Sequence, residues 1–353
     1  MTTFDPNAAA LPGSGIFGLP HVRDEASVVI VPAPFDATTS YGGGASEGPG
    51  AVLRASAQVD LYDAQFGRTY EAGIHMLDEP LEIRELSRRA RALAEPLIAK
   101  GGADAGDGEA LRMIEQAGEQ VNAYTYENFW HVLADGKVPG LLGGDHSTPL
   151  GAIRACAEYV ASRWRPGDRA SAKGLGILHV DAHLDLRPAY EGFRYSHASI
   201  MYNVLETIPE VSRIVQVGIR DYSEGESEYA RACGDRCRTH LDFQWAQAMM
   251  DGRRFTDLCH QAASELPDNV YVSFDIDGLD PSLCPHTGTP VPGGLSFNQA
   301  ALLLQTLRDA RKTIVGFDLV EVCPDPHPGA PEWDANVGAR VLYKLCGLAA
   351  AGR

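Results

Sequence analysis

The sequence LGILHVDAHLD, residues 175–185, is a short apolar run that ends in three side chains of metal-ligand type. Such a run is typical of a strand buried on both faces of a parallel sheet. Two similar junctions occur, where GGDHS at 143–147 follows the run 140–142 and DIDGLD at 275–280 follows 270–274. In open α/β sheets, ligands bind at the carboxyl ends of the strands. The three junctions therefore predict a parallel sheet with functional residues along one edge.

Further apolar runs alternate with helical patterns along the chain. The additional predicted strands are 27–31, 213–217 and 313–319, and the predicted helices lie around 82–100, 109–135, 149–164, 298–310 and 337–345. This alternation predicts the α/β class, with helices covering both faces of a parallel sheet. No linker or internal repeat divides the chain, so we predict one catalytic domain, 26–353, preceded by an N-terminal arm, 1–25.

The composition limits the kind of partner. The chain has 47 Asp and Glu against 30 Lys and Arg, a net charge of −17, which disfavours nucleic acid and suits a cationic ligand or metal ions. No run of eighteen apolar residues and no signal peptide are evident, so we expect a cytoplasmic protein that does not bind membranes. The seven scattered cysteines indicate reduced thiols. Cys233 and Cys237 have metal-ligand spacing but lack a second pair, so we expect no metal there.

Six side chains at the three junctions are candidate metal ligands: His146, Asp181, His183, Asp185, Asp275 and Asp277. In an extended chain, Asp181, His183 and Asp185 would share one face, because side chains alternate with a period of two. Aspartates often cap helices or make turns after strands, but that explains one Asp and not five. Six ligands exceed what one tetrahedral ion needs, so we predict two divalent ions that activate water for hydrolysis. The isolated histidines His131, His240 and His260 are expected to be structural.

The three motifs GGDHS, DAHLD and SFDIDGLDP (273–281), in this order and spacing, resemble the signatures of the ureohydrolase family, which includes arginase and agmatinase. The resemblance extends from about residue 27 to 345. It implies an α/β/α sandwich and two Mn²⁺ or Ni²⁺ ions per chain. It also implies attack of a metal-bridging hydroxide on a guanidinium carbon, in a trimer or hexamer.

The resemblance also implies a role for each site residue. One ion would be held by His146, Asp181, Asp185 and Asp275, and the other by Asp181, His183, Asp275 and Asp277. Asp181 and Asp275 would then bridge the ions, with Asp185 also counted among the catalytic residues. His197, in YSHAS, matches the proton-shuttling histidine, and its imidazole can protonate a leaving amine near neutral pH. Glu321 matches the carboxylate that binds the guanidinium group. A packed loop histidine and a surface ion pair are the alternatives for these two residues.

The substrate pocket departs from the arginase and agmatinase pattern. Arg187 follows DAHLD, and an extra cation there should oppose agmatine, whose far end is an ammonium group. Formimidoylglutamases also carry an arginine at this place but lack the histidine that His197 supplies. An internal ion pair with Glu191 is the alternative for Arg187.

The less generic stretches 38–44 (TTSYGGG), 185–203, 286–294 (HTGTPVPGG) and 333–346 resemble the bacterial agmatinase-like branch. That branch contains nickel-dependent guanidine hydrolases and metformin hydrolase subunits. The resemblance implies a compact cationic substrate, such as guanidine or an alkylated guanidine or biguanide. The candidate substrate-binding residues are Arg187, Tyr190, Tyr195 and Glu321, and Tyr41 and Phe193 could complete an aromatic wall. Core packing is the alternative for each aromatic residue.

The prediction is thus a binuclear metal-dependent hydrolase acting on a C–N bond of a linear amidine. The enzyme alternatives are an agmatinase or a guanidinobutyrase. A non-catalytic metal-binding subunit of a hetero-hexamer with a paralogous chain is another reading. A deacetylase with a related sheet would need one zinc ion, leaving His146 and Asp277 surplus.

Overall fold

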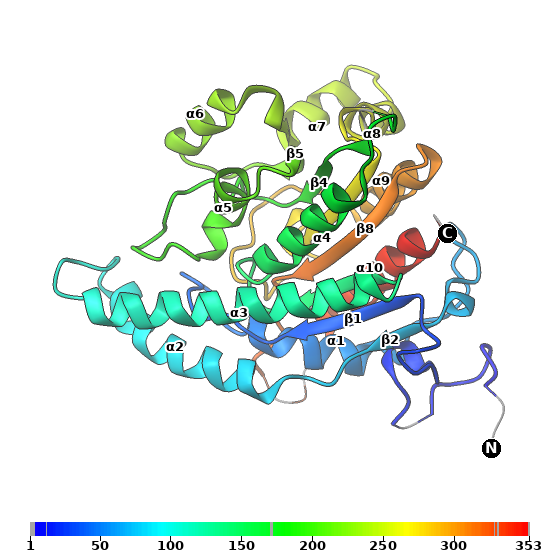
Figure 1. Cartoon of the computed structure of the whole chain (residues 1–353), viewed down its shortest axis with the longest axis horizontal. Coiled ribbons are helices and arrows are strands. Elements are labelled where there is room, and N and C mark those ends of the chain that lie inside the picture. The colour runs from blue at the N-terminus through cyan, green and yellow to red at the C-terminus, as the bar shows by residue number, and fades with distance from the viewer. Residues whose placement is uncertain (1–3, 12, 170–171, 328, 330–331, 352–353) are drawn as a thin grey trace.

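One parallel sheet runs through the molecule (Figure 1). The computed structural model describes residues 4–351, apart from 12, 170–171, 328 and 330–331. Within them the strands are β1 (Val28–Ala33), β2 (Ile74–Met76), β3 (Val138–Gly143), β4 (Leu175–Val180), β5 (Val211–Ile219), β6 (Cys237–Leu241), β7 (Asn269–Asp275) and β8 (Thr313–Val320). They pair in parallel in the order β2-β1-β3-β8-β7-β4-β5-β6. All six predicted strands are present. The edge strands β2 and β6 are not among them, because β2 is short and β6, CRTHL, is mostly polar.

Helices cover both faces of this sheet. They are α1 (Gly48–Ser56), α2 (Leu81–Ala99), α3 (Gly108–Ala134), α4 (Leu150–Arg163), α5 (Ile200–Thr207), α6 (Glu224–Ala232), α7 (Asp242–Met250), α8 (Phe255–Glu265), α9 (Phe297–Asp309) and α10 (Trp333–Ala350). On one face α3 packs on β1 and β3, and α4 packs on β8, β4 and β7, with α2 lying on α3. On the other face α10 packs on β8 and α1, and α9 lies between α10 and α8. The predicted three-layer α/β/α sandwich is confirmed.

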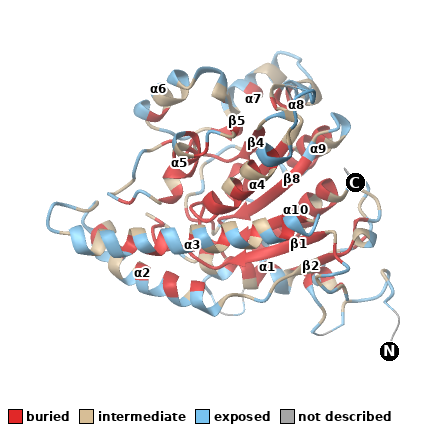
Figure 2. Cartoon of the chain, in the orientation of Figure 1, coloured by how far each residue is buried: buried red, intermediate tan, exposed pale blue. Residues whose placement is uncertain are grey.

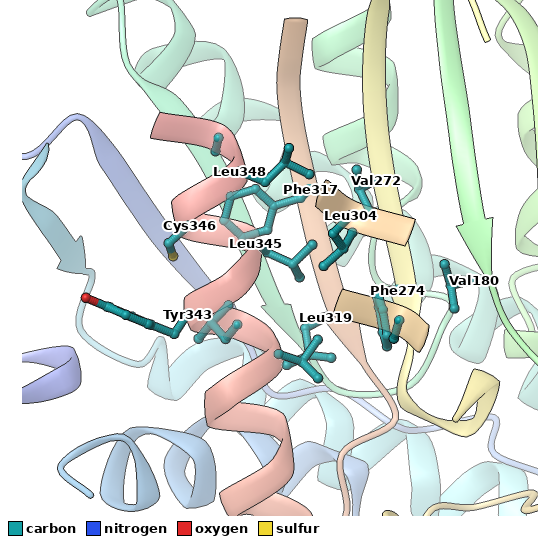
Figure 3. Close-up of a cluster of buried hydrophobic side chains, with 14 of the residues drawn as sticks. Val180, Val272, Phe274, Leu304, Phe317, Leu319, Tyr343, Leu345, Cys346 and Leu348 are labelled. Atoms are coloured by element: carbon teal, nitrogen blue, oxygen red, sulfur yellow. The ribbon is translucent and has the colours of Figure 1, made fainter. Parts of the chain in front are cut away.

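The core consists of two apolar layers separated by the sheet. Successive strand residues point to opposite faces, so Leu141 packs in the layer under α4 while Leu142 packs in the layer under α10. Figure 3 shows part of the second layer, where Phe317 and Leu319 of β8 lie against Leu345 of α10. Figure 2 shows the strands buried and the outer helix faces exposed. Burial on both faces explains why the strands are apolar runs and not alternating ones.

The second half of the predicted N-terminal arm packs on the domain. Ile16, Phe17 and Leu19 are buried in the same layer as α10, and the Phe17 ring meets Tyr343 edge-on with centroids 4.8 Å apart. The Phe17 amide also donates to the hydroxyl of Ser56 over 2.8 Å. The folded core therefore begins before the predicted boundary at residue 26. Residues 1–3 and 12 of the predicted arm, and residues such as 352–353 of the predicted domain, lie outside the described residues.

No helix in the described part of the chain combines the length and the apolar character required to cross a bilayer.

The close packing of α3 on α4 depends on Gly151. A Cβ atom at this position would overlap the backbone carbonyl of Asn122 in α3. We expect Gly151→Ala to destabilise the fold by about 3 kcal/mol, because backbone cannot yield as a flexible side chain can. Urea unfolding of the variant and of the parent chain measures this. Gly108→Ala is the control, since open space surrounds Gly108. Equal midpoints for the two variants would contradict the prediction.

Candidate metal centre

The site lies at the carboxyl ends of the four central strands. β3, β8, β7 and β4 are consecutive neighbours in the sheet although they are far apart in the sequence. His146 follows β3, and Asp181, His183 and Asp185 follow β4. Asp275 ends β7 and is followed by Asp277, and Glu321 follows β8. Strand order therefore brings the predicted ligands to one edge, as expected for an open parallel sheet.

Two groups of donor atoms meet there. The Nδ1 atom of His146 lies 2.9 Å from Asp181 Oδ2, and 3.1 Å from both Asp185 Oδ2 and Asp275 Oδ2. The Nδ1 atom of His183 lies 3.1 Å from Asp277 Oδ2 and 3.4 Å from Asp181 Oδ1. Asp181 thus directs one oxygen toward each imidazole, and it belongs to both of the groups that could hold an ion. The structure brings all six predicted ligands together.

The local backbone that achieves this differs from the extended chain expected at 181–185 and 275–277. β4 ends at Val180, and Asp185 adopts a left-handed conformation with φ 54°. Asp277 lies in a 3₁₀ turn, Ile276–Gly278, and its amide donates to Asp275 Oδ1 over 2.8 Å. A positive φ is uncommon for residues other than glycine and is held only where the surroundings enforce it. Turns, and not a period of two, direct the carboxylates inward.

Hydrogen bonding fixes one proton of His146. The Ser273 hydroxyl donates to Asp318 Oδ1 over 3.1 Å, so its oxygen accepts from the Nε2 atom of His146 at 2.9 Å. We therefore assign a proton to Nε2. The buried Nδ1 atom faces three carboxylates, which outweigh burial and hold the pKa of His146 well above its usual range in the metal-free protein. A cation bound by these carboxylates would take the place of the Nδ1 proton, so this donor set fits a metal ion.

The neighbouring histidines compensate only part of the carboxylate charge: against the effect of burial they hold the pKa of Asp181 well below its usual range, but two other carboxylates are not compensated in this way. Burial, and then repulsion by Asp277 and Asp181, raises the pKa of Asp275 well above its usual range. Burial and the charge of Asp181 raise the pKa of Asp185 to about 7. Divalent cations would supply the missing charge, and carboxylate with imidazole ligands suits both Mn²⁺ and Ni²⁺.

His197 and Glu321 lie side by side next to this cluster. The Nδ1 atom of His197 is 3.6 Å from Glu321 Oε1, and its Nε2 atom is 3.2 Å from the Ser40 hydroxyl. Burial, and then the charge of His183, lowers the pKa of His197 to about 3, so its ring is neutral. Glu321 has φ 61°, and its Oε1 accepts from the His146 amide over 2.9 Å. Its Oε2 is buried and lacks a hydrogen-bond partner in the described structure.

A cavity of about 520 Å³ opens next to the cluster. His183, Asp185 and His197 form part of its lining, and Asp221 and Glu226 add two carboxylates. The only Lys or Arg in its lining, within the described residues, is Arg187. The acidic lining suits a cationic ligand. A second cavity, of about 390 Å³ between α3 and α4, has none of the six clustered ligands in its lining.

The pocket differs from the expected aromatic wall. Arg187 pairs with Glu226, with Nε 3.4 Å from Oε2, and stacks 4.7 Å from the centre of the Tyr190 ring. Its partner is therefore Glu226 and not Glu191. Tyr190 and the exposed Tyr41 line the pocket.

Two of the four predicted aromatic residues are not brought to the pocket. Phe193 is buried against Ala94, Leu97 and Ile114. Tyr195 packs over Gly118 and lines the cavity between α3 and α4. Core packing, the stated alternative, describes both of these side chains.

Some residues that support the cluster were not predicted. His179 in β4 lies with Nε2 2.8 Å from Asp181 Oδ2, and its spacing of two from Asp181 was an available signal. Arg220 donates to the carbonyls of Asp277, Leu279 and Val291 and so fixes the loops around the site, which no motif indicates. Cys237 donates to Gln216 and is in neither possible ion-binding group of the described residues.

The fold and this cluster define a class, the α/β/α hydrolases built around a buried His/Asp metal centre. Comparison with known proteins gives the family. The model of the Arginase family matches residues 26–347, and the chain belongs to that family. The predicted ureohydrolase resemblance and enzyme class, a hydrolase acting on C–N bonds of linear amidines, are confirmed.

Relatives match over almost the whole chain. The N(1)-aminopropylagmatine ureohydrolase of Thermus thermophilus is 33% identical, covering 92% of this chain and 91% of the relative. The agmatinase of Pyrococcus horikoshii is 30% identical, with 92% and 93% covered. The agmatine ureohydrolase structure of Thermoplasma volcanium superposes with a TM-score of 0.68 at 25% identity, covering 96% and 94%.

Proposed function

We propose that this protein hydrolyses a C–N bond of a compact guanidino compound, such as guanidine or an alkylated guanidine or biguanide like metformin. The observation that carries the proposal is the buried Glu321 Oε2, which lacks a partner in the described structure and lies beside His197 and the His/Asp cluster. A planar guanidinium group offers N–H donors that match such an acceptor. The branch-specific sequence stretches support a compact substrate.

The protein groups around the substrate have distinct tasks in this proposal. His146, Asp181, His183, Asp185, Asp275 and Asp277 would hold two divalent ions, Ni²⁺ or Mn²⁺. Bound there, the ions would lower the pKa of a water and so supply the nucleophile. Glu321 holds the guanidinium group, and Asp221 at the pocket favours entry of a cation. His197, neutral and next to Glu321, takes up a proton and passes it to the departing amine.

Replacement of His197 tests the proton transfer. His197→Asn is expected to lower kcat by about 10²–10⁴-fold, the usual contribution of a positioned proton donor. Metal content should stay at the level of the parent chain, because His197 is in neither possible ion-binding group. Steady-state kinetics and elemental analysis give the two numbers. His131→Asn on the exposed end of α3 is the control, and an unchanged kcat in His197→Asn would exclude the role.

A longer guanidino compound with a second charged end is the other candidate substrate, because Arg187 is paired with Glu226. With Glu226 neutralising it, Arg187 opposes a distal ammonium group less than an isolated cation would, while Asp221 remains at the pocket. Agmatine and guanidinobutyrate therefore stay as alternatives, and two of the relatives named above are agmatinase or aminopropylagmatine ureohydrolase.

One substrate panel distinguishes these candidates. The purified chain, loaded with Ni²⁺ or with Mn²⁺, is assayed against guanidine, metformin, agmatine, guanidinobutyrate and formimidoylglutamate, with ammonia, amine and urea-type products quantified. Highest kcat/KM for guanidine or metformin supports the proposal, and highest kcat/KM for agmatine overturns its substrate. Absence of any turnover by the chain alone would favour the non-catalytic subunit. Two metal equivalents per chain, rather than one, would exclude the single-zinc deacetylase.

The proposal includes assembly and location. We propose a cytoplasmic trimer or hexamer of identical chains, with a hetero-hexamer containing a paralogous subunit as the alternative. Light scattering of the purified chain gives its oligomeric state.

A further inference from the structure

A row of polar side chains crosses the sheet beneath the metal centre. Asp318 of β8, Ser273 of β7, His179 of β4, Gln216 of β5 and Thr239 of β6 are partners in one continuous register. Residues in register on neighbouring parallel strands face the same side. All are fully buried except Thr239, which is partly buried. Ser273 and Asp318 fix the Nε2 proton of His146 at one end of this row.

At the other end, backbone and side chains fix the orientation of the Gln216 amide. Its Nε2 lies 2.8 Å from the carbonyl oxygen of Leu184, which can only accept, so the NH₂ group must face Leu184. Its Oε1 accepts from the Thr239 hydroxyl over 2.9 Å and from the Cys237 thiol. The amide therefore has one orientation that satisfies its neighbours.

This orientation determines the tautomer of His179. The same Gln216 NH₂ group lies 3.0 Å from His179 Nδ1, which can then only accept. The His179 proton must be on Nε2, where it is donated to Asp181 Oδ2 over 2.8 Å. The ring is neutral, with its one proton directed at the carboxylate that both donor groups share. His179 belongs to the first of these groups by distance, but its Nε2 carries the proton and its Nδ1 accepts from Gln216, so neither nitrogen offers a lone pair to an ion.

We propose that Gln216 and His179 are positioning residues for Asp181. The Nε2–H of His179 holds Asp181 Oδ2 beside His146, and this leaves Oδ1 facing His183. Gln216 acts through His179 by keeping Nδ1 unprotonated. The inference rests on the proposed function in one respect, that Asp181 binds both ions.

The test compares Gln216→Met with Thr239→Val. Methionine at 216 retains an unbranched side chain but cannot donate to His179. Valine at 239 removes the hydrogen bond to Gln216 Oε1 and leaves the Gln216 NH₂ group with both of its acceptors. Affinity for Mn²⁺ and for Ni²⁺, by competition with a chelator, should fall about 10–100-fold in Gln216→Met. It should stay near that of the parent chain in Thr239→Val. KM at saturating metal should not change in either variant, because neither residue lines the pocket in the described structure.

A spectroscopic measurement on the full, unsubstituted chain keeps the proposal falsifiable if Gln216→Met does not fold. Nitrogen-15 NMR of histidine-labelled, metal-depleted protein, with the His179 signals assigned by their loss in His179→Gln, should show the proton on Nε2. A proton on Nδ1 would overturn the proposal. Equal losses of metal affinity in Gln216→Met and Thr239→Val would also overturn it. The metal affinities and the NMR signals that decide the proposal do not depend on turnover, so failure of the substrate panel would count against the proposed function alone.

Discussion

Asp275→Asn is expected to abolish turnover and metal binding together while leaving the metal-free chain at least as stable as the parent chain. Metal binding is lost while stability is retained, because the Asp275 carboxylate binds the ions but destabilises the metal-free fold. Burial, with repulsion from Asp277 and Asp181, raises the pKa of Asp275. A raised carboxyl pKa means that the folded state binds the proton more tightly than the unfolded state. Stability is therefore lost as pH rises above the unfolded value near 4.

Asparagine fits the same place without the charge. Its Oδ1 can still accept from the Asp277 amide, as Asp275 Oδ1 does at 2.8 Å. Its NH₂ group would take the place of Asp275 Oδ2, 3.1 Å from His146 Nδ1, and loss of this carboxylate favours the neutral ring, whose Nδ1 can accept from this NH₂ group. In Asp275→Asn the repulsion of this side chain by Asp277 and Asp181 is therefore removed, and the two ions lose one of their ligands.

Elemental analysis, kinetics and thermal unfolding of metal-depleted protein measure the three quantities. Asp280→Asn is the matched control, since Asp280 lies five residues on and accepts from the Ser282 amide outside the cluster. Full activity or full metal content in Asp275→Asn would refute the two-ion centre. A large loss of stability in the metal-free variant would show that Asp275 has a structural role.

Glu321→Gln is expected to lose activity with its metal retained. Glutamine can keep the hydrogen bond from the His146 amide at Oε1 but replaces the partnerless Oε2 by an NH₂ donor. A donor directed at a guanidinium group repels it and leaves a buried charge without its partner, which costs about 3–5 kcal/mol. At 1.36 kcal/mol per tenfold change, kcat/KM should fall by roughly two to three and a half orders of magnitude.

Glu191→Gln provides a matched comparison for this change. Glu191 also has a positive φ and a buried oxygen without a partner in the described structure, but its backbone lies against Gly102 and Ala103, whereas Glu321 lies beside His197 and the His146 amide. We expect kcat/KM of Glu191→Gln to stay near that of the parent chain. Loss of metal in Glu321→Gln would instead indicate that Glu321 supports His146, through the amide that it binds.

The central strands and the ligand set were predictable because each strand is an apolar run that ends directly in ligand side chains. The signal at residues 175–185 reports burial on both faces, which the parallel sheet requires. The edge strand β6 had no such signal, since only one neighbour pairs with it and its residues are mostly polar. The expected geometry of Asp185 was wrong because turn conformation depends on tertiary contacts that spacing does not encode.

The pocket wall was the least predictable part. Tyr190 and Tyr195 are only five residues apart, yet Tyr190 lines the pocket and Tyr195 packs over Gly118 in α3. Arg187 could have paired with either Glu191 or Glu226, and the nearer residue in sequence is not its partner. Such choices are made by long-range packing, which a single sequence does not display.

The strand order has a consequence for synthesis of the protein. β7 and β8 lie between β3 and β4, so a chain emerging from the ribosome has a gap two strands wide at the centre of its sheet until residue 320 is made. Contacts between distant segments form slowly and leave apolar strand edges open to aggregation meanwhile. The N-terminal half is therefore expected to depend on chaperone protection, and the centre can acquire its ions only after translation has almost finished.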